Sequence, residues 1–128
     1  DSDPETQLRS LFDQLIPQNN EQQARDYEIV LTELRMQAAQ DKKFQNLIDR
    51  SQNIFCERVK DIVQNGIESG DFRDTDPDLV ADFLTTLYSG EMFERVTTGS
   101  TQSIRSEIDS YIDYRLLADE ECEYNVED

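Results

Sequence analysis

The sequence predicts an all-α fold, with a bundle of five to six helices over residues 1–117 and an acidic, disordered tail at 118–128. Apolar residues recur at helical spacing in one segment after another, and no stretch of useful length alternates apolar and polar residues as a strand does. Asp-Pro pairs at residues 3–4 and 76–77 are strong helix starts, because Asp accepts orphan N–H bonds and proline suits the first turn. A chain of 128 residues suits one domain with its own core.

Two helices are expected in the first third of the chain. Residues 4–16 carry apolar side chains along one helical face, and Pro17 ends that helix because it cannot continue the hydrogen-bond ladder. Asn20 is a suitable cap for a second helix over about residues 21–40. The apolar faces are Leu8, Leu11, Phe12, Leu15 and Ile16 in the first helix, and Tyr27, Val30, Leu31, Leu34 and Ala38 in the second.

A long helix is expected to begin after Asp41 and to end near Gly70, with a break near Ser51 as one interpretation. Gly70 suits the left-handed position that ends many helices, and Phe72 is expected to fold back as a hydrophobic anchor. The apolar residues of this helix are Phe44, Leu47, Ile48, Phe55, Val59, Ile62, Val63 and Ile67.

The next helix, expected over residues 77–96, is apolar around about half of its circumference, whereas an ordinary surface helix has a stripe of roughly 100°. Its apolar residues are Leu79, Val80, Phe83, Leu84, Leu87 and Tyr88, and so wide a face needs more than one burial partner. A turn around Gly99 leads to the last helix, near residues 102–117. The stripe of that helix comprises Ile104, Ile108, Tyr111, Ile112, Arg115 and Leu116.

The chain is strongly acidic. It has 29 Asp and Glu residues against 12 Lys and Arg residues, and the net charge of −17 repels nucleic acid and anionic lipid. Only three of the basic residues are Lys. Many carboxylates with little Lys are typical of a halophilic protein, because molar salt screens self-repulsion, and an acidic mesophilic protein is the alternative. The longest aliphatic run, residues 29–31, is too short to span a bilayer, so we expect a cytoplasmic protein without membrane contact.

Residue types that support catalysis or metal binding are scarce. The chain has no histidine, and its four glycines fit no phosphate-binding motif. Glu28 with Glu33, and Glu91 with Glu94, are conceivable metal-ligand pairs, but a solvated charged face is the simpler interpretation in so acidic a chain. We therefore expect neither enzyme activity nor a metal or cofactor.

The stretch VQNGIESGDFRDTDPDLVADFLTTLYSG, residues 63–90, resembles the C-terminal domain of TetR-family transcriptional regulators. The pattern consists of a helix, two spaced glycines, a Gly-x-Phe segment, an Asp-Pro helix start and a leucine-rich helix that ends in glycine. Here it is carried by Gly66, Gly70, Phe72, Asp76, Pro77, Leu79, Leu84, Leu87 and Gly90. Residues 4–16 resemble the segment after the DNA-binding region, and residues 27–63 resemble the long central helices of the family.

The resemblance implies a homodimer in which the last two helices of each chain form a four-helix bundle across a two-fold axis. Such an interface uses the same patch on both subunits, so a self-complementary aliphatic stripe is expected. The candidate interface residues are Leu79, Val80, Phe83, Leu84, Leu87, Gly90, Ile104, Ile108, Tyr111 and Ile112. Gly90 would allow close approach of another helix. A monomer whose own helices bury the wide apolar face is the alternative.

The resemblance also implies a small-molecule effector bound among the first four helices, in a cavity with aromatic and aliphatic walls. The candidate ligand-binding residues are Tyr27, Leu31, Leu34, Phe55, Tyr88 and Met92. Arg35 or Arg58, if buried, would indicate an anionic effector.

The function implied is that of a regulatory domain, by default of a repressor, whose effector changes the spacing of two DNA-binding heads. DNA would be contacted only through an N-terminal helix-turn-helix that this chain lacks. An acidic helical adaptor without a ligand cavity, which binds basic proteins, is the alternative from another class. An enzyme with a carboxylate-held metal comes third.

Overall fold

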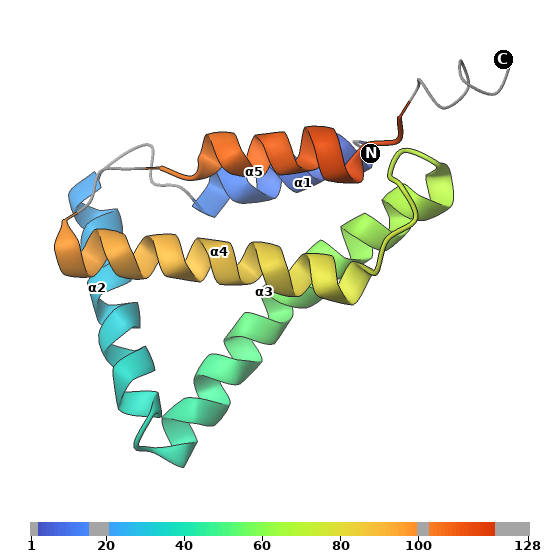
Figure 1. Ribbon diagram of the computed structural model, residues 1–128. Helices are drawn as coiled ribbons and strands as arrows, with labels where there is room; N and C mark the ends of the chain where they lie inside the picture. The colour runs from blue at the N-terminus through green and yellow to red at the C-terminus, as the bar shows by residue number, and fades with distance from the viewer. Residues whose placement is uncertain (1–2, 16–20, 100–102, 120–128) are drawn as a thin grey trace, which may run out of the picture.

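The computed structural model describes residues 3–15, 21–99 and 103–119, and this part of the chain is helical almost throughout (Figure 1). Its elements are α1 (Pro4–Leu15), α2 (Glu21–Ala38), α3 (Lys42–Ser69), α4 (Pro77–Thr98), α5 (Arg105–Tyr111) and the π-helical turn η1 (Ile112–Leu116). The only β-type pairing among these residues is an isolated bridge between Phe72 and Leu117. The predicted all-α fold is confirmed.

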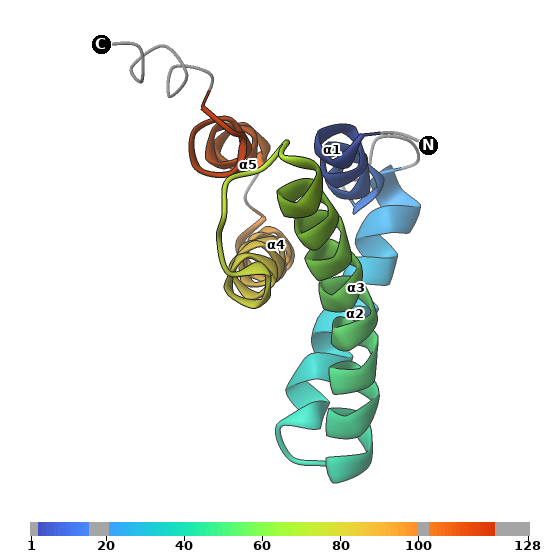
Figure 2. The same ribbon diagram turned by 90° about the vertical axis from the view of Figure 1, so that its right-hand side faces the viewer.

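The helices α2 and α3 form a long antiparallel hairpin whose closed end projects away from the rest of the molecule (Figure 1). The helix α4 crosses this hairpin and contacts both of its arms. At the other end of α3, α1 and α5 lie on either side of its last turns (Figure 2). Arg9 of α1 reaches across to α5 and η1, with nitrogen–oxygen distances of 2.6 Å to Asp109 and 2.5 Å to Asp113.

The predicted caps at Asp41 and Asp76 are confirmed. The carboxylate of Asp76 accepts hydrogen bonds from the backbone amides of Asp78 and Leu79, directly before Pro77 at the start of α4. Asp41 accepts from the amide of Lys43 in the same way at the start of α3. These side chains satisfy N–H groups that have no partner inside the helix, which fixes where each helix begins.

The helices differ from the expectation at three places. The helix α3 continues without a break through Ser51. Its end is as predicted, because Gly70 has a φ of 86° in the left-handed region and Phe72 folds back into the core. The last helix begins at Arg105, not at residue 102, and changes from α to π geometry at Ile112. Pro17 and Asn20 lie outside the described residues, as do residues 120–128 of the expected tail.

One core joins α1, α3, α4, α5 and η1. Its buried members are Leu8, Leu11, Phe12, Val59, Ile62, Val63, Phe72, Val80, Ala81, Leu84, Ile108, Ile112 and Leu116. The π turn explains how the last of these positions stay buried. Residues four apart drift by about 40° around an α-helix of 3.6 residues per turn, so a wider turn keeps Ile108, Ile112 and Leu116 on one side. All three are at most 3% exposed.

The end of the described chain is attached to the loop between α3 and α4. The backbone amide of Arg73 donates to the carbonyl of Leu116 at 2.7 Å, and the amide of Ala118 donates to the carbonyl of Asp71 at 2.9 Å. The Arg73 guanidinium adds a hydrogen bond to the carbonyl of Leu117. The backbone after η1 is therefore satisfied by the loop that Phe72 anchors.

Candidate functional site

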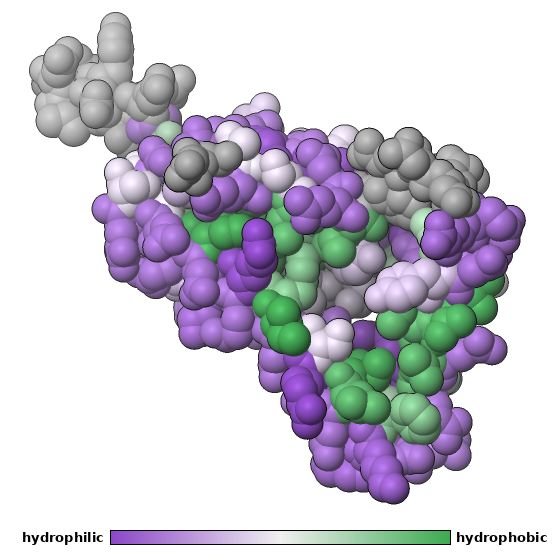
Figure 3. Space-filling view, turned by 180° about the vertical axis from the view of Figure 1, so that it is seen from behind, coloured by the Kyte–Doolittle hydropathy of each residue, from purple (hydrophilic) through white to green (hydrophobic). Residues whose placement is uncertain are grey.

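A hollow of about 180 Å³ lies between α2, α3 and α4, with the end of α1 as a fourth wall. In Figure 3, which shows the molecule from behind, hydrophobic residues gather on both sides of this recess. Most of the lining is aliphatic or aromatic, three residues are polar and uncharged, and Arg35 is the one charged residue in it. The lining consists of Leu15, Tyr27, Leu31, Arg35, Ile48, Ser51, Gln52, Phe55, Tyr88, Ser89 and Met92.

The hollow brings together five of the six residues that the sequence indicated as ligand-binding candidates. These are Tyr27, Leu31, Phe55, Tyr88 and Met92. The sixth, Leu34, does not line it, and the reason is the spacing along α2. Tyr27, Leu31 and Arg35 are four residues apart and share one face, whereas Leu34 lies about 100° away from Arg35 around the helix. Arg35 therefore occupies the place expected for Leu34.

Aromatic side chains form the end of the hollow nearest the core. The rings of Phe55 and Tyr88 have centroids 6.3 Å apart, and Phe12 meets Phe55 edge-on from behind at 6.0 Å. Burial raises the pKa of the Tyr88 hydroxyl, and the nearby carboxylate of Glu28 raises it further. Tyr88 is therefore neutral at physiological pH and presents an aromatic surface with one polar atom.

An ion-pair network that the sequence did not indicate lies beside the hollow. Arg95 of α4 forms two hydrogen bonds with Glu28 of α2, at 3.0 Å from Nε and 2.6 Å from its terminal nitrogen. Arg95 also lies 3.4 Å from Glu91, and the second oxygen of Glu91 accepts the backbone amide of Ile104, which precedes α5. The network therefore joins α2, α4 and the start of α5.

The expectation that Glu28 belongs to a solvated face is wrong, since Glu28 is only 5% exposed. A buried carboxylate needs a charged partner, and Arg95 supplies one at a spacing of 67 residues. Hydrogen bonds to Glu28 raise the pKa of Arg95, so this guanidinium stays charged at physiological pH. A pair so distant in the chain leaves no local pattern in the sequence.

An apolar ridge runs along the outer side of α4. We define this outer ridge by Leu79, Phe83, Leu87 and Gly90, which are three or four residues apart, together with Tyr111 of α5. Leu79 is 66% exposed and Phe83 is 45% exposed. The rings of Phe83 and Tyr111 are 5.0 Å apart, so the two helices form one surface.

The prediction of a dimer interface is corrected at four residues, because these residues are buried within this chain. Val80, Leu84, Ile108 and Ile112 are at most 5% exposed and belong to the core of this chain. The wide apolar face of α4 thus has an inner half, which contains Val80 and Leu84, and an outer half. Ile104 is partly buried against the same core.

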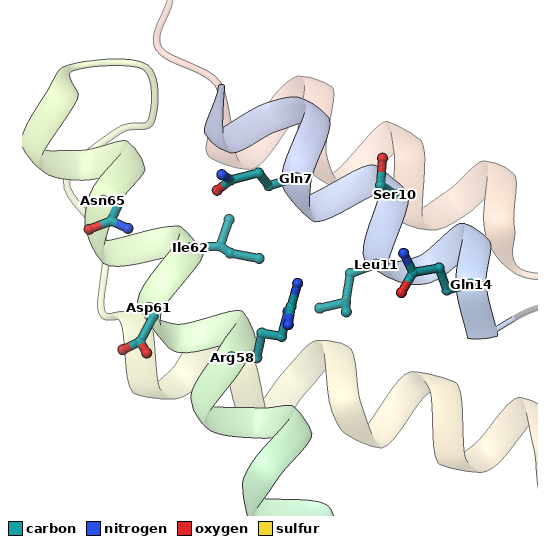
Figure 4. A pocket seen from close by; sticks show the side chains of 8 residues that line it. All are labelled: Gln7, Ser10, Leu11, Gln14, Arg58, Asp61, Ile62 and Asn65. Atoms are coloured by element: carbon teal, nitrogen blue, oxygen red, sulfur yellow. The ribbon is translucent and has the colours of Figure 1, made fainter. Parts of the chain in front are cut away.

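A second hollow, of about 290 Å³, lies between α1 and α3 and is largely polar (Figure 4). Leu11 and Ile62 form its apolar floor, and Arg58 extends from α3 toward α1. Arg58 is exposed, so it does not meet the condition for an anion-binding arginine that the sequence suggested.

Two absences hold for residues 3–15, 21–99 and 103–119. No group of three or more Cys, Asp or Glu side chains there is arranged to hold a metal ion. None of the helices in these ranges is both long and apolar enough to cross a bilayer.

No protein-family model and no curated protein matches the sequence. Solved structures with a similar fold include the following two. A TetR transcription regulator from Haloarcula marismortui ATCC 43049 is 28% identical, with a TM-score of 0.81 over 91% of this chain. A protein described as a transcriptional regulator from Saccharomonospora viridis, solved in complex with choline, is 18% identical, with a TM-score of 0.79 over 93% of this chain.

The chain spans 65% of the length of the Haloarcula protein and 62% of the length of the Saccharomonospora protein. The likeness therefore extends over nearly all of this chain but over only part of either regulator. Together with the glycine and Asp-Pro pattern of residues 63–90, it shows that the chain has the all-α fold of TetR-family transcription regulators.

Proposed function

We propose that this chain is the effector-binding and dimerisation part of a transcription regulator. The observation that carries the proposal is the hollow, because it gathers five residues from three helices that the sequence singled out, in a fold shared with a TetR regulator. An acidic adaptor would need no such recess. The regulator acts in the cytoplasm, and by default as a repressor.

Contact with DNA is proposed to belong to a separate helix-turn-helix unit. A net charge of −17 repels the phosphate backbone, so this chain does not bind DNA directly. The effector would act by population shift, because it binds one arrangement of the helices more tightly than another. The network of Glu28, Arg95, Glu91 and Ile104 offers a connection between the wall of the hollow and α5.

The outer ridge is proposed to join two copies of the chain. Multi-angle light scattering after gel filtration in molar KCl should give a dimer at micromolar concentration. Phe83→Glu should yield a monomer, because it places a charge in an apolar interface. Ile54→Glu is the matched control, since Ile54 is 71% exposed on α3, and this variant should remain a dimer. A monomeric parent protein would refute the dimer.

The hollow is proposed to bind one small, largely apolar molecule. Indole is a suitable neutral probe because the chain contains no Trp, so its fluorescence is readily distinguished from that of the five tyrosines. An engineered cavity of about 150 Å³ binds benzene, so a hollow of 180 Å³ is of suitable size. Indole fluorescence should shift to shorter wavelength on binding. Ser89→Phe, which fills the hollow, should abolish the shift, and Ser106→Phe, on the exposed side of α5, should retain it.

A further inference from the structure

The charge inside the hollow is opposite in sign to that of the whole chain. Arg35 is the only charged residue in the lining, and no Asp or Glu lines the hollow in the part of the chain that the structure describes. Among those residues Arg35 takes part in none of the ion pairs, whereas Arg9, Arg95 and Arg105 are all paired with carboxylates. A half-buried arginine outside the ion pairs, in so acidic a protein, has a guanidinium available to bind an anion.

The remaining lining separates into two ends. Because α2 and α3 run antiparallel, Arg35 lies toward the closed end of the hairpin with Ile48, and Tyr27 lies toward Phe55. Ser51 and Gln52 add a hydroxyl and an amide between these ends. A ligand with one polar terminus and one apolar body matches this arrangement.

The size of the hollow limits the apolar body. Its volume of about 180 Å³ is below the range of about 300–1,000 Å³ usual for drug-sized ligands, and close to that of a cavity that holds benzene. The rings of Phe55 and Tyr88, 6.3 Å apart, form the wall on which a single flat ring would pack.

We propose that the hollow binds a small carboxylic acid with one aromatic ring, its carboxylate held by the Arg35 guanidinium and its ring packed against Phe55 and Tyr88. This inference rests on the proposed function of the hollow and adds the chemical class of its ligand. A planar guanidinium can hold a carboxylate by two parallel hydrogen bonds, which a neutral or cationic ligand cannot accept in that way.

Calorimetric titration with three probes of similar size tests the charge of the ligand. The probes are benzoate, benzyl alcohol and benzyltrimethylammonium, and molar KCl at neutral pH screens the net charge of the protein. Benzoate should bind about tenfold or more tightly than benzyl alcohol, since its carboxylate accepts two charge-assisted hydrogen bonds from the guanidinium where an uncharged hydroxyl accepts one. The cation should bind most weakly.

Variants of two arginines locate the carboxylate. Arg35→Met keeps an apolar stem and should weaken benzoate binding about tenfold or more, and by a clearly larger factor than benzyl alcohol binding, which loses at most one hydrogen bond to an uncharged oxygen. Arg35→Lys keeps the charge but not the planar guanidinium, so its affinity for benzoate should lie between those of the parent protein and Arg35→Met. Arg58→Met is the matched control, because Arg58 is another arginine outside the ion pairs of the described residues but lines the hollow between α1 and α3. It should change neither affinity.

The outcomes separate this inference from the function on which it rests. If benzyl alcohol binds as tightly as benzoate, if the cation binds best, or if Arg35→Met leaves benzoate binding unchanged, the carboxylate class is wrong although the hollow still binds ligands. If neither indole nor any of the three probes binds the parent protein, the proposed effector site itself is wrong.

Discussion

A single missing methyl group decides how the loop after α3 packs. A Cβ atom at Gly66 would lie 2.2 Å from the ring of Phe72, so the glycine is required for the close approach of that ring. Gly90 differs, since a Cβ there would meet nothing within 4 Å in this chain. The two glycines belong to the same sequence pattern, but only at Gly66 does the lack of a side chain make room for a neighbouring ring within this chain.

We predict that Gly66→Ala destabilises the protein by about 1–2 kcal/mol. Overpacking in a core costs about 1–3 kcal/mol, and the better helix propensity of Ala recovers up to about 1 kcal/mol. Urea unfolding measures the change. In a Phe72→Leu background the smaller side chain should relieve most of the loss, and an unchanged loss there would show that the Phe72 contact is not its cause.

Cys56 offers a second test at a single residue. Burial raises the pKa of its thiol above the ordinary value of 9.0, and the thiol also donates to the carboxylate of Asp82 at 3.4 Å. Folding therefore favours the protonated thiol, and this contribution to stability is lost as pH rises through the raised pKa. Asp82→Asn should lower that pKa.

Because the lower pKa increases the fraction of thiolate at pH 8, Asp82→Asn should speed the alkylation of Cys56 by iodoacetamide severalfold at that pH. The thiolate is the form that reacts. The measurement needs a Cys122→Ser background, so that only one thiol reacts. Glu57→Gln, a weaker influence on the same pKa, should have a smaller effect. Equal rates in all variants would contradict this account.

Among the elements, α4 was the most predictable and the last helix the least. The Asp76 cap and Pro77 predict where α4 begins, and its wide apolar face predicts more apolar surface than the core of this chain covers. Helical periodicity could not separate Val80 and Leu84, which face the core, from Leu79 and Phe83, which face outward, because all four fall in one continuous arc. The π turn at Ile112–Leu116 depends on core packing and on the pairing with Phe72, which periodicity does not express.

The candidate hollow was predictable only for its apolar walls. Family resemblance predicts an apolar lining of Tyr27, Leu31, Phe55, Tyr88 and Met92, but their meeting around one recess depends on how α4 crosses the hairpin. Glu28 and Arg95, which pair between α2 and α4, are 67 residues apart in the sequence. Local residue spacing therefore does not predict this ion pair.

We predict that Arg95→Met destabilises the protein by about 3 kcal/mol, because it leaves the carboxylate of Glu28 buried without its partner. The double variant Glu28→Met/Arg95→Met should recover most of this loss, since no charge then remains buried. Lys60→Met, which removes an exposed pair with Asp78, should have little effect. Chemical denaturation of the four proteins gives the comparison. A double variant as unstable as Arg95→Met would argue against an uncompensated charge as the cause.

At the scale of the whole molecule, excess negative charge is the dominant feature. The eight ion pairs of the described residues use Arg far more than Lys, and most Asp and Glu side chains of those residues take no part in them. Repulsion among these carboxylates weakens the folded state, and salt reduces it because the screening length falls from about 10 Å at 0.1 M to about 3 Å at 1 M.

The melting temperature should therefore rise steadily with KCl concentration at pH 7, as circular dichroism can measure. The salt effect should shrink near pH 4, close to the isoelectric point of about 4.1, where the net charge approaches zero. A protein equally stable in dilute buffer and in molar KCl would contradict the halophilic interpretation of the composition.

The attachment of the chain end to the loop at Phe72 has a topological consequence. Asp3 and Glu5, at the start of α1, border the same recess as Leu117 and Asp119, so the two ends of the described chain are neighbours. A short peptide linker could join them without crossing the body of the molecule. A circular permutant opened in the turn between α2 and α3, far from the core, would then keep every buried contact while its connectivity changes.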